Sequence, residues 1–454
     1  MAIQYLTSKV SKHPSILVIA SFALIDIIGT LLLLLPWMHV KDISPLDAIF
    51  TATSAVCVTG LTVVNTASAF TPLGQLVIML LMEIGGLGVM TFSVLFAIAL
   101  KRDIGFSSRF VVQEGFLHMR VPNINNVVKM IIFYALWVEI LTTLALTVFF
   151  SKKFPVEEAF FYACFHSVSA FCNAGFSTFP TGLTPFKENW GVCLTIMIAI
   201  LLGNSGFSVF YELKEKILKR EKRPFSLHLK LTLIVHLGLI IFGTVAILFT
   251  EANGILKDFS PLNKLLVASF HSVSARTAGF NTIAISDLTE DSLYILIILM
   301  FIGACPGSTG GGIKTTTISL LFVAAISRIR GFTKAVAFEK TIPEEAVQKA
   351  TALFILSIVT LFIAHALMMF AGPNLPFRAS HSEFLAYLFE TVSGLGTVGL
   401  SVGITNNLGD FGKIIMILIM FIGRVGLLSF VSVLTMAGKT PKSYHYPSEN
   451  IMIG

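Results

Sequence analysis

The stretch Glu390-Thr391-Val392-Ser393-Gly394-Leu395-Gly396-Thr397-Val398-Gly399-Leu400-Ser401 decides the fold of this chain. Its core, Thr397-Val398-Gly399, is typical of an ion filter in which backbone carbonyl oxygens replace the hydration shell of the ion. A single stretch of this kind cannot surround an ion. The pattern therefore predicts further copies elsewhere in the chain.

Three related stretches precede it and complete a fourfold internal repeat. They are Ser54–Leu61, Ser169–Phe176 and Ser274–Phe280, and the second and third also share the sequence Phe-His-Ser-Val-Ser-Ala. The four glycines are 115, 104 and 120 residues apart, at Gly60, Gly175, Gly279 and Gly399. Equivalent glycines at such intervals indicate repeated structural units. The third stretch is one residue shorter before its glycine, which leaves its register open.

Composition places the chain among polytopic membrane proteins. It is 55% hydrophobic and only 13% charged, with a mean hydropathy of +0.85. Soluble domains carry about 25% charged residues. Because a membrane-spanning helix needs about 20 apolar residues, eight spans are predicted. They are residues 14–37, 72–100, 126–150, 190–212, 229–250, 291–326, 346–371 and 411–436.

Each pair of spans encloses one filter stretch and a segment too short to cross a bilayer. These segments, 45–56, 157–170, 261–274 and 383–394, predict re-entrant half-helices that protein or a water-filled cavity must surround. The predicted fold is all-α, with four helix–pore-helix–filter–helix repeats around a central pore. The repeats are expected at residues 1–110, 111–225, 226–345 and 346–454, with the broken span in the third and a short tail in the fourth.

The distribution of basic residues predicts the orientation. The two termini and the loops after the even-numbered spans hold 21 Lys and Arg residues, against 8 on the opposite side. By the positive-inside rule, both termini are cytoplasmic. The basic run from Lys214 to Arg223 is therefore interpreted as a juxtamembrane loop near anionic lipid rather than a nucleic-acid site.

Other chemical signals are weak. The five cysteines form no Cys-x-x-Cys pair, so neither a disulfide framework nor a zinc site is expected, and Cys57 and Cys172 are interpreted as small packing residues. An enzyme would need clustered acids, bases or nucleophiles, whereas acids such as Glu83 and Glu139 look isolated. His166 could sense pH, but a packing role is favoured for it and for the equivalent histidine of the third repeat. No catalytic residue and no covalent cofactor are predicted.

The filter stretches supply the predicted ion ligands. Glycine suits a crowded axis because it has no side chain and reaches positive φ at little cost. Arg276 lies close to the third filter and is expected to brace it from behind, since a cation on the axis would repel the transported ion. The predicted carbonyl ligands are Val58, Thr59, Gly60, Asn173, Ala174, Gly175, Thr277, Ala278, Gly279, Thr397, Val398 and Gly399.

The sixth span is interrupted by the Gly-rich stretch Gly303–Thr317, which no stable helix would tolerate. A phosphate-binding loop is disfavoured because Ile313 separates Gly312 from Lys314. A flexible gating loop under the filter is favoured, with Arg424 of the eighth span beside it in the pore. A salt bridge from this arginine to Glu83 is the alternative. The gating candidates are Gly303, Pro306, Gly307, Gly310, Gly311, Gly312, Lys314 and Arg424.

With four single-glycine filters, the broken sixth span and Arg424, the sequence resembles the Trk/Ktr/HKT superfamily of potassium transporters, and most closely the membrane subunit of the bacterial Ktr system. The resemblance implies potassium uptake, often stimulated by sodium, with one pore per subunit of a homodimer. It also implies a cytosolic regulatory ring that binds nucleotide, and a location in the bacterial cytoplasmic membrane. Glycine in all four filters is the potassium type of the pattern.

Two other functions stay open. The chain could transport sodium or another monovalent cation, or it could be a secondary transporter with alternating access. The second class favours inverted repeats and helices broken at the midplane. Here the repeats are parallel and fourfold, which argues for the channel-like interpretation.

Overall fold

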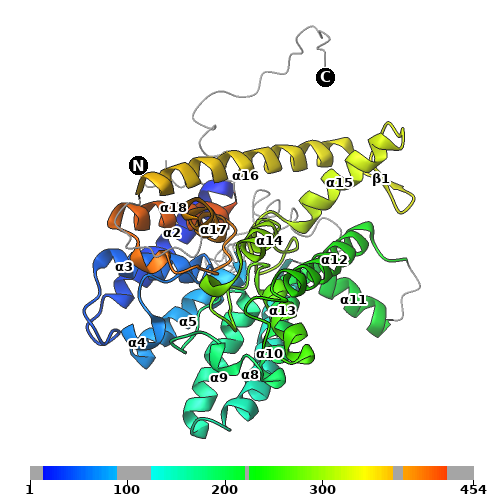
Figure 1. The fold of residues 1–454 in the computed structure, drawn as a ribbon. Helices are drawn as coiled ribbons and strands as arrows, with labels where there is room; N and C mark the ends of the chain where they lie inside the picture. The colour runs from blue at the N-terminus through cyan, green and yellow to red at the C-terminus, as the bar shows by residue number, and fades with distance from the viewer. Residues whose placement is uncertain (1–13, 89–123, 220–223, 372–381, 427–454) are drawn as a thin grey trace.

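A computed structural model describes residues 14–88, 124–219, 224–371 and 382–426 of the chain (Figure 1). The predicted repeat boundary at residue 110, the C-terminal tail and the ends of the second and eighth predicted spans (residues 89–100 and 427–436) lie outside them. In these described residues the fold is mostly helical. The only sheet among them is a short antiparallel hairpin of β1 (Val336–Ala337) and β2 (Lys340–Thr341), in which Val336 pairs with Thr341.

The first half of the chain forms two helical units. The first contains α2 (Pro14–Leu33), α3 (Pro45–Val56), α4 (Thr66–Ala69) and α5 (Pro72–Gly86). The second contains α8 (Ile124–Phe150), α9 (Val156–Cys172), the 3-10 helix η1 (Thr184–Phe186), α10 (Trp190–Asn204) and α11 (Phe207–Lys219).

The second half repeats this plan. The third unit contains α12 (Leu227–Thr250), α13 (Pro261–Ser274), η2 (Ile285–Asp287), α14 (Glu290–Phe301) and α15 (Thr315–Ile329). The fourth contains α16 (Glu344–Ala371), α17 (Glu383–Leu395), η3 (Thr405–Asn407) and α18 (Asp410–Val425). This order confirms the prediction of an all-α fold made of helix–pore-helix–filter–helix repeats.

The four predicted half-helices are α3, α9, α13 and α17, and their observed ends lie within two residues of the predicted ones. Serine side chains cap three of them: Ser44, Ser260 and Ser382 each accept a hydrogen bond from a backbone N–H of the first turn. The longest, α9, has 17 residues and is about 25 Å long at 1.5 Å per residue. That is shorter than the hydrocarbon core of about 30 Å.

Long apolar helices flank the half-helices. Among the described residues, three helices are long and apolar enough to cross a membrane: Val128–Phe150, Leu227–Thr250 and Glu344–Ala371. A fourth crossing is possible if α10 and α11 count as one bent span. The other predicted spans contain shorter helices, α2, α5, α14 with α15, and α18.

The fourth predicted span, residues 190–212, is not one continuous helix as the sequence suggested. The chain bends by 94° between α10 and α11. Gly206 has a φ of +84°, and a Cβ there would meet the carbonyl oxygen of Pro306. The next residue, Phe207, donates its backbone N–H to the Gly307 carbonyl oxygen over 3.0 Å. The bend therefore lets α11 pack against the broken sixth span, a contact that the local sequence does not reveal.

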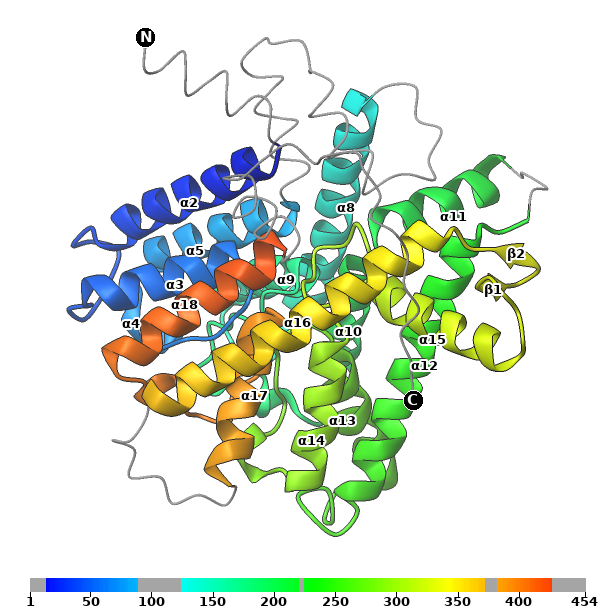
Figure 2. The ribbon, with the colours of Figure 1, turned by 90° about the horizontal axis from the view of Figure 1, so that it is seen from above.

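The repeats are arranged in a closed circle. The second long helix of each repeat contacts the half-helix of the next: α5 contacts α9, α10 contacts α13, and α14 contacts α17. The circle closes where α18 contacts α3, and Figures 1 and 2 show these two helices side by side although they lie at opposite ends of the chain. The buried apolar clusters also join residues of successive repeats. The four filter stretches are thereby brought to the centre.

Candidate functional site: a ring of four filter stretches and the loop beneath it

The four filter stretches share one backbone conformation. In each, the glycine and the residue two positions before it have positive φ. The earlier residues are Val58, Asn173, Thr277 and Thr397, with φ of 55°, 60°, 67° and 50°. The glycines Gly60, Gly175, Gly279 and Gly399 have φ of 88°, 71°, 75° and 96°. Because non-glycine residues rarely adopt positive φ, four at matching positions show that the repeats are equivalent at the level of the backbone.

The stretches form a ring in which each glycine faces the next repeat. A Cβ on Gly175 would lie 2.8 Å from the carbonyl oxygen of Ala278. A Cβ on Gly60, Gly279 or Gly399 would likewise meet the carbonyl oxygen of Ala174, Val398 or Thr59, respectively. Each of these oxygens belongs to the residue just before the neighbouring glycine. A side chain at any of the four positions would therefore collide with backbone.

Equivalent serines hold each stretch to its half-helix. The hydroxyls of Ser54 and Ser393 accept the backbone N–H of their filter glycines, both at 3.1 Å. Ser169 and Ser274 donate instead to the carbonyl oxygen of the residue after the glycine. These side-chain contacts brace each stretch against the end of its half-helix.

The register of the third stretch follows from one shared hydrogen bond. In every repeat the residue before the glycine donates its N–H to the carbonyl oxygen of that serine. The donors Thr59, Ala174 and Val398 lie five residues after their serines, whereas Ala278 lies four after Ser274. The third stretch is therefore one residue shorter between the serine and the filter. Thr277, Ala278 and Gly279 match the last three residues of the other stretches.

The interrupted sixth span forms a loop directly under this ring. Between α14 and α15 the chain folds back on itself, and Gly303 donates its N–H to the Ile313 carbonyl oxygen at 2.9 Å. The Thr309 hydroxyl donates to the Phe171 carbonyl oxygen at 2.9 Å and accepts from the Asn173 amide at 2.7 Å. The loop is therefore bonded to the base of the second filter.

Two loop glycines lie against the filter residues that have positive φ. A Cβ on Gly310 would meet the Thr277 hydroxyl, and one on Gly311 would meet the Thr397 hydroxyl. Neither hydroxyl has a hydrogen-bond partner among the described residues, although both are buried. Glycine at these positions allows the loop to lie against the third and fourth filters.

Two cations accompany the loop. Arg424 of α18 donates to the carbonyl oxygens of Thr309, at 2.5 Å, and Gly85. Lys314 donates to the Gly310 carbonyl oxygen at 2.7 Å. Arg424 therefore joins the loop to the first repeat. Within the described residues, the structure records these carbonyl contacts and not the salt bridge to Glu83 that the sequence left as an alternative.

A cavity of about 300 Å³ lies at the base of the filter. Gly396 of the fourth filter, loop residues such as Gly311 and Lys314, and Arg424 all line it. Six of the eight gating candidates, all except Gly303 and Pro306, therefore surround one space together with the residue just before the predicted ligands of the fourth filter. Pro306 does not line it and packs against the bend at Gly206 instead.

The buried Arg276 contacts both its own repeat and the loop. Its guanidinium group donates to the carbonyl oxygens of His236, at 3.1 Å, and Gly303, at 2.8 Å, and lies 2.8 Å from the His236 Nδ1 atom. These contacts agree with a brace behind the third filter. His166 is also buried and lies within hydrogen-bond distance of the Tyr162 carbonyl oxygen and the Ser177 hydroxyl, as expected of a packing histidine.

One sequence-based interpretation is wrong. Glu83 and Glu139 are not isolated: one carboxylate oxygen of each and the Cys172 sulfur lie within 4.8 Å of one another. The three residues come from α5, α8 and α9, and only the packing of these helices brings them together. Glu390 is a further residue that the motifs did not single out, a buried carboxylate that accepts hydrogen bonds from Ser401 and Thr405 just after the fourth filter.

Comparisons with known proteins agree with this architecture. A family profile described as "TrkH: Cation transport protein" matches residues 4–445. The chain belongs to the TrkH family. It is 37% identical to the "Ktr system potassium uptake protein B" of Bacillus subtilis, over 97% of this chain and 96% of that protein. It is 36% identical to the "Potassium/sodium uptake protein NtpJ" of Enterococcus hirae, over 97% of each.

The TrkH fold is also evident from a solved structure. The crystal structure of the potassium transporter TrkH from Vibrio parahaemolyticus matches with a TM-score of 0.72 at 19% identity, over 93% of this chain and 85% of that one. At this identity the likeness concerns the fold. The TrkH family is one of ion transporters rather than enzymes, so the chain is a polytopic membrane transporter of this family.

Proposed function

We propose that this chain takes up potassium ions through the ring of filter stretches, with the backbone carbonyl oxygens of the ring as ligands. The observation that carries the proposal is the closed set of contacts in which each filter glycine faces a carbonyl oxygen of the next repeat. Such a ring offers an ion oxygen ligands from all sides, as dehydration requires. The names of the Bacillus and Enterococcus relatives, both called potassium uptake proteins, favour potassium as the ion.

In this proposal Gly303–Thr317 and Arg424 form the gate. The loop lies under three of the four filters, and two cations stand beside the cavity below them. A positive charge at this depth raises the energy of a passing cation, and water is scarce there to screen it. Opening requires the loop to leave its contacts with Phe171, Asn173 and Arg424. The membrane potential then drives entry with about 2.3 kcal/mol per charge per 100 mV.

Several finer features belong to the same proposal. Sodium stimulation is suggested by the name of the Enterococcus relative, which pairs potassium with sodium. The resemblance to Ktr membrane subunits favours a homodimer, a cytosolic nucleotide-binding ring that acts on the loop, and the bacterial cytoplasmic membrane. The excess of Lys and Arg in alternate loops favours cytoplasmic termini. The four repeats keep the boundaries given above.

Ion uptake in a bacterial strain that lacks its own potassium uptake systems tests the proposal. We expect wild type to restore potassium uptake, Gly399→Ser to lose the preference for potassium over sodium, and deletion of residues 304–316 to raise the flux. If Gly399→Ser keeps full selectivity, the filter assignment is wrong. If wild type carries sodium equally well, the chain is a general monovalent-cation transporter. If only the deletion has no effect, the gate lies elsewhere.

A further inference from the structure

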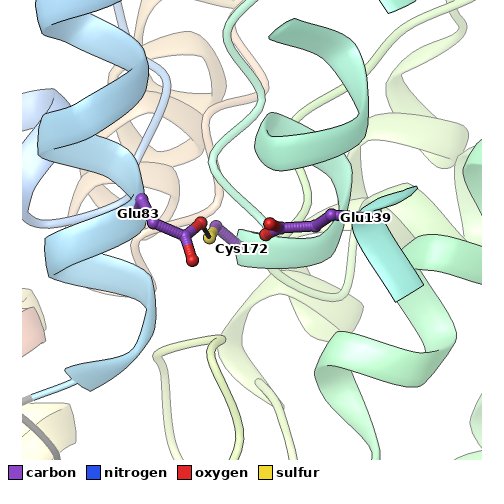
Figure 3. Close-up of side chains that lie close together, drawn as sticks. All are labelled: Glu83, Glu139 and Cys172. Atoms are coloured by element: carbon purple, nitrogen blue, oxygen red, sulfur yellow. Dashed lines mark hydrogen bonds between the residues drawn. The ribbon is translucent and has the colours of Figure 1, made fainter. Parts of the chain in front are cut away.

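Behind the second filter, Glu83, Glu139 and Cys172 converge from three helices. Figure 3 shows their side chains pointing toward one another, from α5, α8 and α9. The Cys172 thiol donates a hydrogen bond to a carboxylate oxygen of Glu83 over 3.3 Å. The close approach of α5 and α9 depends on Gly86, because a Cβ there would meet the same sulfur.

The cluster contains two carboxylates, and the cation recorded near it is Arg424, whose guanidinium binds the Gly85 carbonyl oxygen and not either glutamate. Glu139 is only 7% exposed, and its Oε1 atom is buried with no hydrogen-bond partner in the described part of the chain. Within that same part, neither glutamate makes a salt bridge. Two carboxylates so close together in an apolar interior repel each other unless a proton or a cation lies between them. The Cys172 sulfur, which lies within 4.8 Å of an oxygen of each glutamate, supplies a third ligand atom for such a cation.

We propose that these three side chains bind a borderline-soft divalent cation of the Zn²⁺ or Cd²⁺ class. On binding, the Cys172 thiol releases its proton to solvent, so the thiolate and the two carboxylates carry −3 against +2, and the nearby Arg424 guanidinium offsets the remaining −1. Tetrahedral zinc with a Zn–S bond of about 2.3 Å and a Zn–O bond of about 2.1 Å would separate sulfur and oxygen by about 3.6 Å, close to the observed 3.3 Å. The cysteine selects against Mg²⁺ and Ca²⁺, which prefer oxygen ligands.

The site adjoins the filter. Cys172 is the last residue of α9, and Asn173 begins the second filter with positive φ. A bound ion would tie this end of α9 to α5 of the first repeat and to α8. The first repeat has a cysteine at the equivalent position, Cys57. Among the described residues, the recorded cluster of possible ligands contains Cys172 and not Cys57.

Equilibrium binding of Cd²⁺ to the purified, detergent-solubilised full chain tests the site. Cadmium is the probe because its bond to a thiolate gives an ultraviolet charge-transfer band. We expect one Cd²⁺ per chain with this band, undiminished by about a hundredfold excess of Mg²⁺. Cys172→Ser should abolish the band, and Glu139→Gln should weaken binding at least tenfold. Cys193→Ser is the matched control, because Cys193 is equally buried but donates to the Phe186 carbonyl oxygen instead.

The outcomes separate cleanly. Absence of binding to wild type would mean that a shared proton holds the two carboxylates together, and the proposal is then overturned. It is also overturned if the band survives in Cys172→Ser or disappears equally in Cys193→Ser. Size-exclusion chromatography verifies that each variant is folded. If Cys172→Ser does not fold, Glu83→Gln replaces it, with loss of Cd²⁺ affinity as the expected result.

Discussion

The filter ring and the layer directly beneath it differ sharply in symmetry. In the ring, the four stretches repeat the same signs of φ and the same backbone hydrogen bond to a serine carbonyl oxygen. They also repeat the same close approach of a glycine to the carbonyl oxygen of the next repeat. Beneath it, the second long helices of the repeats diverge: α10 bends by 94° into α11, a loop separates α14 from α15, and α18 carries Arg424. Equal coordination from all sides needs a symmetric backbone. The proposed gate is asymmetric by contrast, since its loop comes from the third repeat alone.

Small residues preserve the shared plan below the ring in three repeats. A Cβ on Gly85, Gly203 or Gly423 would meet a carbonyl oxygen near the end of the half-helix of its own repeat. The third repeat departs from this plan, because Gly303 packs against Gly311 of the loop and accepts a hydrogen bond from Arg276. Substitutions in each layer test whether the ring and the lower layer are energetically separable.

Replacing a ring glycine should have the largest effect. Gly399→Ala adds both the strain of positive φ, about 1–2 kcal/mol, and a collision with the Thr59 carbonyl oxygen. Gly403→Ala is the matched control, since Gly403 has a φ of 98° but no atom within 4 Å of a new Cβ. We expect the first variant to lose potassium selectivity by at least tenfold in uptake assays and the second to keep it. Equal behaviour of the two would show that strain, not the ring contact, matters.

Loosening the loop should change the rate of uptake and not its selectivity. Thr309→Val removes the hydroxyl that joins Phe171 and Asn173, leaving two buried polar groups unpaired at about 1–3 kcal/mol each. We expect the closed state to be destabilised and potassium flux to rise about tenfold. Ser308→Ala is the control, because its hydroxyl donates only to Cys305 within the loop. A fall in flux with Thr309→Val would contradict a closing role.

The braces after the filters should have moderate effects that differ between repeats. Ser401 donates to the Glu390 carboxylate at 2.6 Å, whereas Ser177 lies 2.9 Å from the His166 ring. Hydrogen bonds to charged groups contribute about 1.5–3 kcal/mol and neutral ones about 0.5–1.5 kcal/mol. Ser401→Ala should therefore lower the thermal unfolding midpoint more than Ser177→Ala. The opposite order would indicate that Glu390 is uncharged in the folded protein.

The smallest effect is expected at the ion pair that joins the first and fourth repeats. The Lys413 Nζ atom lies 2.6 Å from the Asp47 Oδ1 atom, and the two side chains are 15% and 16% exposed. Pairs that retain contact with solvent contribute up to about 1 kcal/mol. A double-mutant cycle with Lys413→Met and Asp47→Asn should give a coupling energy in this range. A value of several kcal/mol would mean that this pair, rather than packing, closes the circle of repeats.

The sequence predicted the symmetric layer better than the asymmetric one, for a physical reason. Half-helices and filter glycines are local features, since capping residues, apolar length and positive φ are encoded within a few positions. The bend at Gly206 depends on a partner 100 residues away, at Pro306. The Glu83 and Glu139 cluster likewise depends on how α5 packs against α8 and α9. The carbonyl partners of Arg424 were equally invisible, because any residue type offers a backbone oxygen.

The most direct test of the central claim is anomalous diffraction from crystals grown in Rb⁺ or Tl⁺, which substitute for K⁺. We predict anomalous peaks on the axis of the ring, within coordination distance of the carbonyl oxygens of Thr59, Ala174, Ala278 and Val398. The peaks should be weaker or absent when Na⁺ replaces most of the heavier ion. Peaks confined to other parts of the protein, with an empty ring, would contradict the account.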